Sequence, residues 1–154
     1  MTFISMLIQH HAGPTGKVLI CKNENGKWEF PRGKVKTNET SEQAVERIAW
    51  EQFRMVVKCG KMTMIGRNKP DDGYGEHILC GNIRHNTNTK YNYREYYEAI
   101  DLWQTEPENI KYDEYAWVHP TELAEYAFEG DDANFLAKYD PWVNCEQIFD
   151  VRMY

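Results

Sequence analysis

The sequence has few cysteines, and none lies close enough to another to form a metal-binding or redox motif. The four cysteines are Cys21, Cys59, Cys80 and Cys145. Zinc ribbons and thioredoxin-like active sites need C-x-x-C pairs, so this spacing excludes both classes. Scattered thiols without a secretory leader are typical of a reducing compartment. We therefore expect a cytoplasmic protein.

The sequence also lacks a hydrophobic run long enough to cross a membrane. Its apolar start, residues 1–9 (MTFISMLIQ), is far shorter than the roughly 20 residues that a spanning helix needs. This segment has neither the basic n-region nor the small-residue cleavage site of a signal peptide. It indicates a first core strand, and no membrane partner is expected.

An excess of positive charge is absent as well. The 24 acidic and 18 basic residues give a net charge of -6. Proteins that hold nucleic acid by bulk electrostatics usually carry a basic face, so this balance disfavours that class. An acidic protein can still bind the phosphates of a nucleotide if a divalent cation and a few local Lys or Arg residues neutralise them. The 154 residues contain no repeat or linker and fit a single domain over residues 1–154, with a homodimer left open.

Short β-rich segments and turn signals alternate with two helical regions, which predicts a mixed α/β chain. The expected strands cover residues 3–11, 17–22, 27–30, 61–66, 77–84, 94–103 and 115–119. Residues 31–33 break the strand pattern before a polar loop. A helix is expected over residues 41–55, with Thr40 or Ser41 as N-cap. Further helices are expected from residue 120 and over residues 132–139. Strand alternation should place Tyr96 and Tyr97 on opposite faces.

The most informative segment is residues 28–55, WEFPRGKVKTNETSEQAVERIAWEQFRM. It resembles the Nudix box, which reads Gly, five residues, Glu, seven residues, then Arg-Glu-apolar-x-Glu-Glu-x-Gly-apolar. The matching positions are Gly33, Glu39, Arg47, Ala49, Glu51 and Met55. Residues 28–31 (Trp-Glu-Phe-Pro) are similar to the lead-in of many members. On these residues the chain resembles the Nudix (MutT-like) hydrolase family, with a degenerate box over Gly33–Met55.

This resemblance implies a Nudix-type α/β/α sandwich with a mixed central β-sheet and the box helix packed on it. It implies a metal-assisted pyrophosphohydrolase that cleaves a nucleoside diphosphate linked to another moiety. The partner would be a nucleotide or a nucleotide-derived small molecule, and the cofactor Mg²⁺ or Mn²⁺. The implied metal ligands are the Gly33 carbonyl, Glu51, Gln52 and Glu114.

The resemblance also implies catalytic and substrate-binding residues. Arg47 lies one helical turn before Glu51, so it can orient that carboxylate and hold the loop residue Glu39. These three are the expected catalytic residues. The candidates for contact with substrate phosphates are basic: Arg32, Lys34 and Arg67.

Three positions depart from the family pattern. Ile48 stands where the family has a metal-binding Glu, Gln52 replaces the last Glu, and Arg54 replaces the Gly that ends the helix. Two unit charges about 4 Å apart interact by roughly 4 kcal/mol at an effective dielectric near 20, so losing two carboxylates weakens a cation site. The alternative is a Nudix-fold protein that binds a nucleotide without cleaving it, as a sensor or interaction module. Residues that select the substrate are expected in loops 67–75 and 85–92.

Overall fold

The computed structural model describes residues 2–10, 16–68, 77–79, 92–103, 105–108 and 111–138. The strands are β1 Thr2–Gln9, β2 Val18–Lys22, β3 Trp28–Glu29, β4 Arg32–Lys34, β5 Val57–Asn68, β6 His77–Leu79, β7 Asn92–Asp101 and β8 Glu114–Val118. The helices are α1 Ser41–Phe53, the 3₁₀ helix η1 Pro120–Glu125 and α2 Gly130–Lys138. None of these helices is long and apolar enough to cross a membrane.

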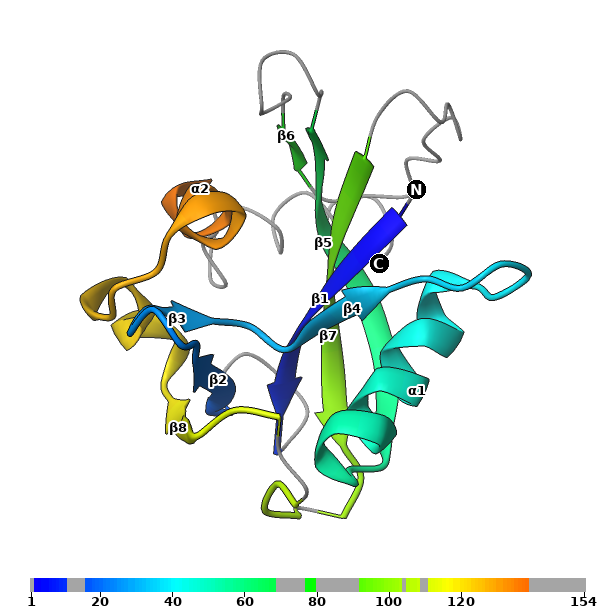
Figure 1. Cartoon of the computed structure of the whole chain (residues 1–154), viewed down its shortest axis with the longest axis horizontal. Helices are drawn as coiled ribbons and strands as arrows, with labels where there is room; N and C mark the ends of the chain where they lie inside the picture. The colour runs from blue at the N-terminus through cyan, green and yellow to red at the C-terminus, as the bar shows by residue number, and fades with distance from the viewer. Residues whose placement is uncertain are drawn as a thin grey trace, which may run out of the picture.

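The strands form one mixed sheet in the order β3-β2-β1-β7-β5-β6 (Figure 1). β4 pairs with β1, and β8 pairs with β2. β1 and β7 are parallel, which requires a long connection between them, and α1 lies in that connection. A loop over residues 35–40 joins β4 to α1, as Figure 1 shows.

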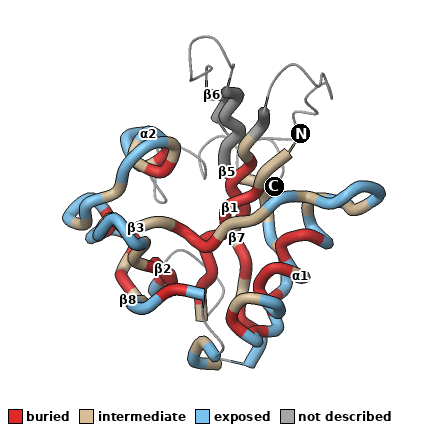
Figure 2. The backbone as a smooth tube through the Cα atoms, in the orientation of Figure 1, coloured by how far each residue is buried: buried red, intermediate tan, exposed pale blue. Residues whose placement is uncertain are grey.

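Alternation along β1 divides the core into two layers. Ile4, Met6 and Ile8 pack with the apolar face of α1, whereas Leu7 belongs to the cluster that contains Phe135 of α2. The buried residues of α1 are Ala44, Val45, Ile48, Ala49 and Phe53. In Figure 2 the buried backbone follows the central strands and the sheet-facing side of α1. The predicted sandwich of a mixed sheet between helices is confirmed.

The expected alternation on β7 is also correct. Tyr97 packs in the cluster under α1, and Tyr96 packs in the cluster under α2. The Tyr96 ring stacks on Phe135 with centroids 4.0 Å apart, and Phe30 meets the edge of both rings. These contacts fix α2 on its face of the sheet.

Two segments near the site differ from the expectation. Residues 32–34, where the sequence predicted a break in the strand pattern and the start of a polar loop, form β4 because Phe3, Ile4 and Ser5 of β1 pair with them. β5 begins at Val57, ahead of Gly60, because it pairs with β7 across register shifts between Cys59 and Met64. Gly60 fits this irregularity, since a Cβ there would lie 3.1 Å from the Glu98 carbonyl oxygen.

The N-terminus of α1 is capped as expected. The Thr40 side chain accepts a hydrogen bond from the Gln43 backbone N–H, and the Gln43 side chain accepts one from the Thr40 N–H. This reciprocal pair is a capping box, which satisfies two of the free donors at the helix start.

The C-terminus of α1 ends without the usual glycine. Arg54 adopts φ 55° and ψ 38°, the left-handed conformation that disfavours L side chains. The contact of its side chain with the Trp50 ring, 5.1 Å from the centroid, partly offsets this strain.

We predict that Arg54→Gly raises the free energy of unfolding by about 0.5 kcal/mol in urea denaturation. Arg54→Ala is the matched control, because it keeps the strain and loses the Trp50 contact. A glycine variant no more stable than the alanine variant would contradict this prediction.

Candidate functional site

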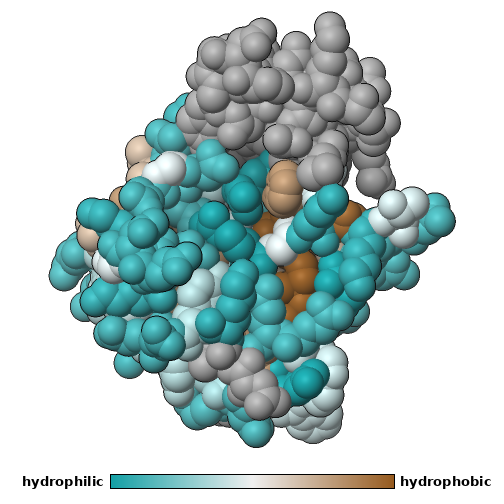
Figure 3. All heavy atoms as spheres, in the orientation of Figure 1, coloured by the Kyte–Doolittle hydropathy of each residue, from teal (hydrophilic) through white to brown (hydrophobic). Residues whose placement is uncertain are grey.

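A pocket of about 640 Å³ lies between β4, the loop after it and α1. Its lining residues are Gly33, Lys34, Val35, Lys36, Thr37, Arg47, Ile48, Glu51 and Gln52. Figure 3 shows apolar surface at the bottom of a hollow on this side of the molecule, with hydrophilic residues around it. The box residues at positions 48, 51 and 52 therefore share one pocket, as their helical spacing indicates.

Arg47 holds the polar wall of this pocket in place. Its Nε and Nη2 donate to the two carboxylate oxygens of Glu39 at 2.7 and 3.0 Å, and its Nη1 donates to Glu51 Oε1 at 2.8 Å. Nη2 also donates to the Lys34 carbonyl at 2.9 Å. The hydrogen bond from Arg47 lowers the pKa of Glu39 below its ordinary value. One guanidinium thus connects the loop, β4 and α1 in the arrangement expected from the sequence.

Ile48 fills the space directly beneath Gly33. The Ile48 side chain is almost fully buried in the core under α1, and a Cβ added to Gly33 would overlap its Cδ1. A larger residue at position 33 would therefore have to displace the Ile48 side chain, because the backbone of β4 passes in contact with it. The family's carboxylate position is occupied here by an apolar group that belongs to the core.

The Gln52 side chain forms a hydrogen bond through its nitrogen, whereas its oxygen has no hydrogen-bond partner. Its Nε2 donates to the Arg32 carbonyl at 3.0 Å, which ties α1 to the start of β4. A glutamate could not donate this bond, so the amide explains the departure from the family residue at this position. The Gln52 Oε1 is buried and has no hydrogen-bond partner. It is therefore an oxygen available to a cation or to a ligand N–H or O–H group.

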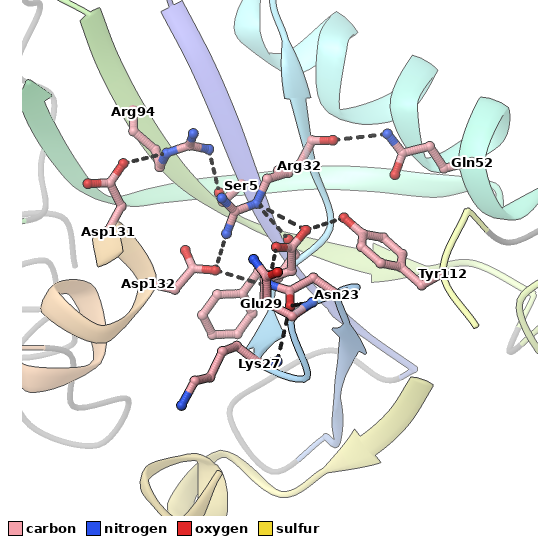
Figure 4. Close-up of polar contacts among 12 residues, drawn as sticks. Ser5, Asn23, Lys27, Glu29, Arg32, Gln52, Arg94, Tyr112, Asp131 and Asp132 are labelled. Carbon is pink, nitrogen blue, oxygen red and sulfur yellow. Dashed lines mark hydrogen bonds and ion pairs between the residues drawn. The ribbon is translucent and has the colours of Figure 1, made fainter. Parts of the chain in front are cut away.

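The side chain of Arg32 is directed toward α2, away from Gln52 (Figure 4). It donates through Nη2 to Asp132 Oδ2, which also accepts the Phe30 backbone N–H at 3.0 Å. The Tyr96 hydroxyl donates to Asp132 Oδ1 at 2.7 Å. Burial raises the pKa of Asp132, and the charge of Arg32 and the bonds from Tyr96 and Phe30 oppose this rise. The fully buried Asp132 carboxylate thus accepts hydrogen bonds from three donors, which tie α2 to Tyr96 and to the segment before Gly33.

Glu29 is a second carboxylate partner of Arg32. Its Oε2 lies 3.6 Å from Arg32 Nε and accepts a hydrogen bond from the Tyr112 hydroxyl, while Asn23 Nδ2 donates to its Oε1 at 3.1 Å. A substrate phosphate would have to compete with two carboxylates for Arg32. The role of Arg32 in substrate binding stays a prediction.

Two predicted site residues remain, Glu114 and Arg67. Glu114, at the start of β8, is exposed and lies 3.7 Å from Lys22 Nζ. It is not among the lining residues of the pocket, so its role as a metal ligand stays a prediction. Arg67 lies on β5 opposite Tyr93, but its side chain is outside the described residues. Most of loops 67–75 and 85–92 is outside them too.

The described part of the chain contains no group of three His, Cys, Asp or Glu side chains that could hold a metal ion. The oxygens available in the pocket are those of Glu51, the Gln52 Oε1, the Thr37 hydroxyl and backbone carbonyls. Mg²⁺ commonly binds through one or two carboxylates together with waters and substrate phosphates. These residues therefore fit a metal ion that arrives with a phosphate ligand, and they do not form a complete protein cage.

Comparisons with known proteins agree with this fold. The family model of the NUDIX domain matches residues 6–139. A MutT protein from Methanosarcina mazei Go1 is similar at 18% identity and TM-score 0.59, covering 90% of this chain and 91% of that one. The Nudix hydrolase RenU from M. smegmatis is similar at 16% identity and TM-score 0.63, covering 89% and 81%.

A third similar structure is the NUDIX domain of Shewanella oneidensis NrtR complexed with ADP ribose. It has 17% identity and a TM-score of 0.57, and the match covers 89% of this chain and 84% of that one. A search of curated proteins finds no match. These structural likenesses show the fold, and the family model covers most of the sequence. The chain belongs to the Nudix family.

Proposed function

We propose that this chain is a pyrophosphohydrolase that cleaves a nucleoside diphosphate linked to another moiety, with its phosphates in the pocket between β4 and α1. The observation that carries the proposal is the arrangement around Arg47. Its guanidinium bonds Glu39, Glu51 and the Lys34 carbonyl together, so that the Glu51 carboxylate is held at the pocket in a fixed position. Fixed charges at a reacting centre need no reorganisation during reaction, which is the main source of electrostatic catalysis.

A divalent cation, Mg²⁺ or Mn²⁺, would be held by Glu51, the Gln52 Oε1 and the Gly33 carbonyl. The buried and unpartnered Gln52 Oε1 supports this assignment. When bound, such an ion polarises a phosphoryl oxygen and lowers the pKa of bound water. Glu39 and Arg47 are positioning residues in this proposal, because they act on Glu51 through hydrogen bonds. Lys34, exposed on the rim, contributes positive charge toward the phosphates.

ADP-ribose is a suitable first substrate to test, because the similar NUDIX domain of NrtR was solved with that molecule. Nucleoside triphosphates, dinucleoside polyphosphates and capped RNA complete the set, each with Mg²⁺ or Mn²⁺. We predict release of phosphate-containing products from at least one substrate. Glu51→Gln should lower the rate by at least roughly tenfold, because it removes a direct ligand and even groups that only orient metal ligands are worth tenfold to a hundredfold. Glu46→Gln, the same change on the exposed surface of α1 outside the pocket, should leave the rate unchanged.

The second candidate function is nucleotide binding without cleavage. It is favoured by Ile48, which occupies the carboxylate position with a buried apolar group. Tight binding of one compound of the set without product release would select this function over hydrolysis.

A further inference from the structure

The pocket between β4 and α1 has the opposite charge sign to the chain as a whole. Its charged lining consists of three cations, Lys34, Lys36 and Arg47, and one carboxylate, Glu51. The full chain carries a net charge of -6. Ile48 and Gln52, where the family pattern has carboxylates, are neutral, and this loss of negative charge leaves the positive charges of the lining in excess.

The excess charge resides on the two lysines. Arg47 is paired with two carboxylates, Glu39 and Glu51, so these three side chains carry one net negative charge, and Lys34 and Lys36 bring the net charge of the group to +1. Lys34 and Lys36 are exposed, and neither ammonium group forms an ion pair within the described part of the chain. They flank Val35 on the segment that forms one wall of the pocket. A mobile ammonium group with three donors is a common phosphate-binding group in proteins.

We propose that Lys34 and Lys36 bind the diphosphate group of a ligand directly, without a divalent cation. This rests on the proposed function, since it concerns the same pocket, but it separates capture of the diphosphate from its hydrolysis. In an ordinary Nudix pattern the cation offsets the negative charges of both the protein and the phosphates. Here the protein itself provides positive charge, so a metal ion is needed only for the bond-breaking step.

Titration calorimetry with inorganic pyrophosphate and with ADP, in EDTA at low salt, tests this directly. We expect both to bind, and we expect adenosine, which has no phosphate, not to bind. Each contact is exposed, so the Lys34→Ala/Lys36→Ala double variant should weaken both affinities by roughly tenfold. Lys58→Ala, which removes one positive charge from an exposed position outside the pocket, should have no effect. Binding should also weaken as salt is added.

Glu51→Gln separates the binding of pyrophosphate from hydrolysis, because the two measurements should respond differently to this change. Removing this negative charge should maintain or tighten pyrophosphate binding in EDTA, whereas it should abolish most metal-dependent hydrolysis. If wild-type protein binds no pyrophosphate or ADP in EDTA, the proposal is overturned. It is also overturned if Lys58→Ala weakens binding as much as the double variant. Hydrolysis with Mg²⁺ but no binding in EDTA would overturn this inference alone. Binding in EDTA without hydrolysis of any substrate would overturn only the proposed enzymatic function.

Discussion

Replacing Asp132 with alanine is expected to lower the free energy of unfolding by about 3 kcal/mol, the scale for breaking a buried ion pair. The carboxylate is fully buried and accepts bonds from Arg32, Tyr96 and the Phe30 N–H. Its removal leaves three donors without this acceptor, and Glu29 is then the remaining carboxylate partner of Arg32 among the described residues. Urea denaturation, read at constant m-value, measures the loss.

The neighbouring residue supplies a matched control for Asp132. Asp131 lies on the same turn of α2 and pairs with Arg94 at 3.0 Å, but its side chain is 24% exposed. Asp131→Ala should cost less than about 1 kcal/mol, because partly exposed ion pairs contribute little. Equal losses for the two variants would mean that the buried network around Asp132 is not a major source of stability.

Replacing Ile48 with glutamate is expected to make stability depend on magnesium. Without metal the change places a charge in the core under α1, which should lower the free energy of unfolding by about 2–4 kcal/mol. With metal, the new carboxylate lies one helical turn from Glu51 in the same pocket and can act as a ligand. Mg²⁺ at 100 times its Kd would then restore about 2.7 kcal/mol.

The same variant should increase metal-dependent hydrolysis, since a second carboxylate strengthens the metal site. Thermal unfolding with and without Mg²⁺, together with the rate on the best substrate, measures both effects. Ile48→Gln is the control, because it has nearly the same shape and burial cost but no charge. If the glutamate and glutamine variants respond identically to Mg²⁺, then position 48 is not adjacent to a metal site in this protein.

Local spacing was sufficient to predict much of the site. The bonds from Arg47 to Glu51 and to the nearby loop residue Glu39 follow from helical spacing and the motif, and the Thr40 cap follows from its position before the apolar face. The alternation of Tyr96 and Tyr97 follows from the period of a strand. Such features depend on residues that are close together in the sequence, so the sequence alone is enough to predict them.

The contacts of Arg32 and Gln52 could not be predicted in this way. Arg32 and Asp132 are 100 residues apart, and their contact depends on how α2 packs against Tyr96 and Phe30. The bond from Gln52 to the Arg32 carbonyl depends on β4 pairing with β1, and this short strand follows a proline with no alternating pattern. The sequence around Asp132 gave no such signal, because acidic residues in the first turn of a helix are common and are usually exposed.

Arg32 connects the helices on opposite faces of the sheet through a single residue. Its carbonyl accepts from Gln52 of α1, and its guanidinium binds Asp132 of α2. A ligand that binds more tightly when this peptide is held in place must therefore also stabilise the docking of α2. For such a ligand, thermodynamic linkage makes the relation reciprocal, so docking of α2 would raise the affinity of the pocket by the same factor. Amide hydrogen exchange in α2 would then report on the binding of that ligand beside α1.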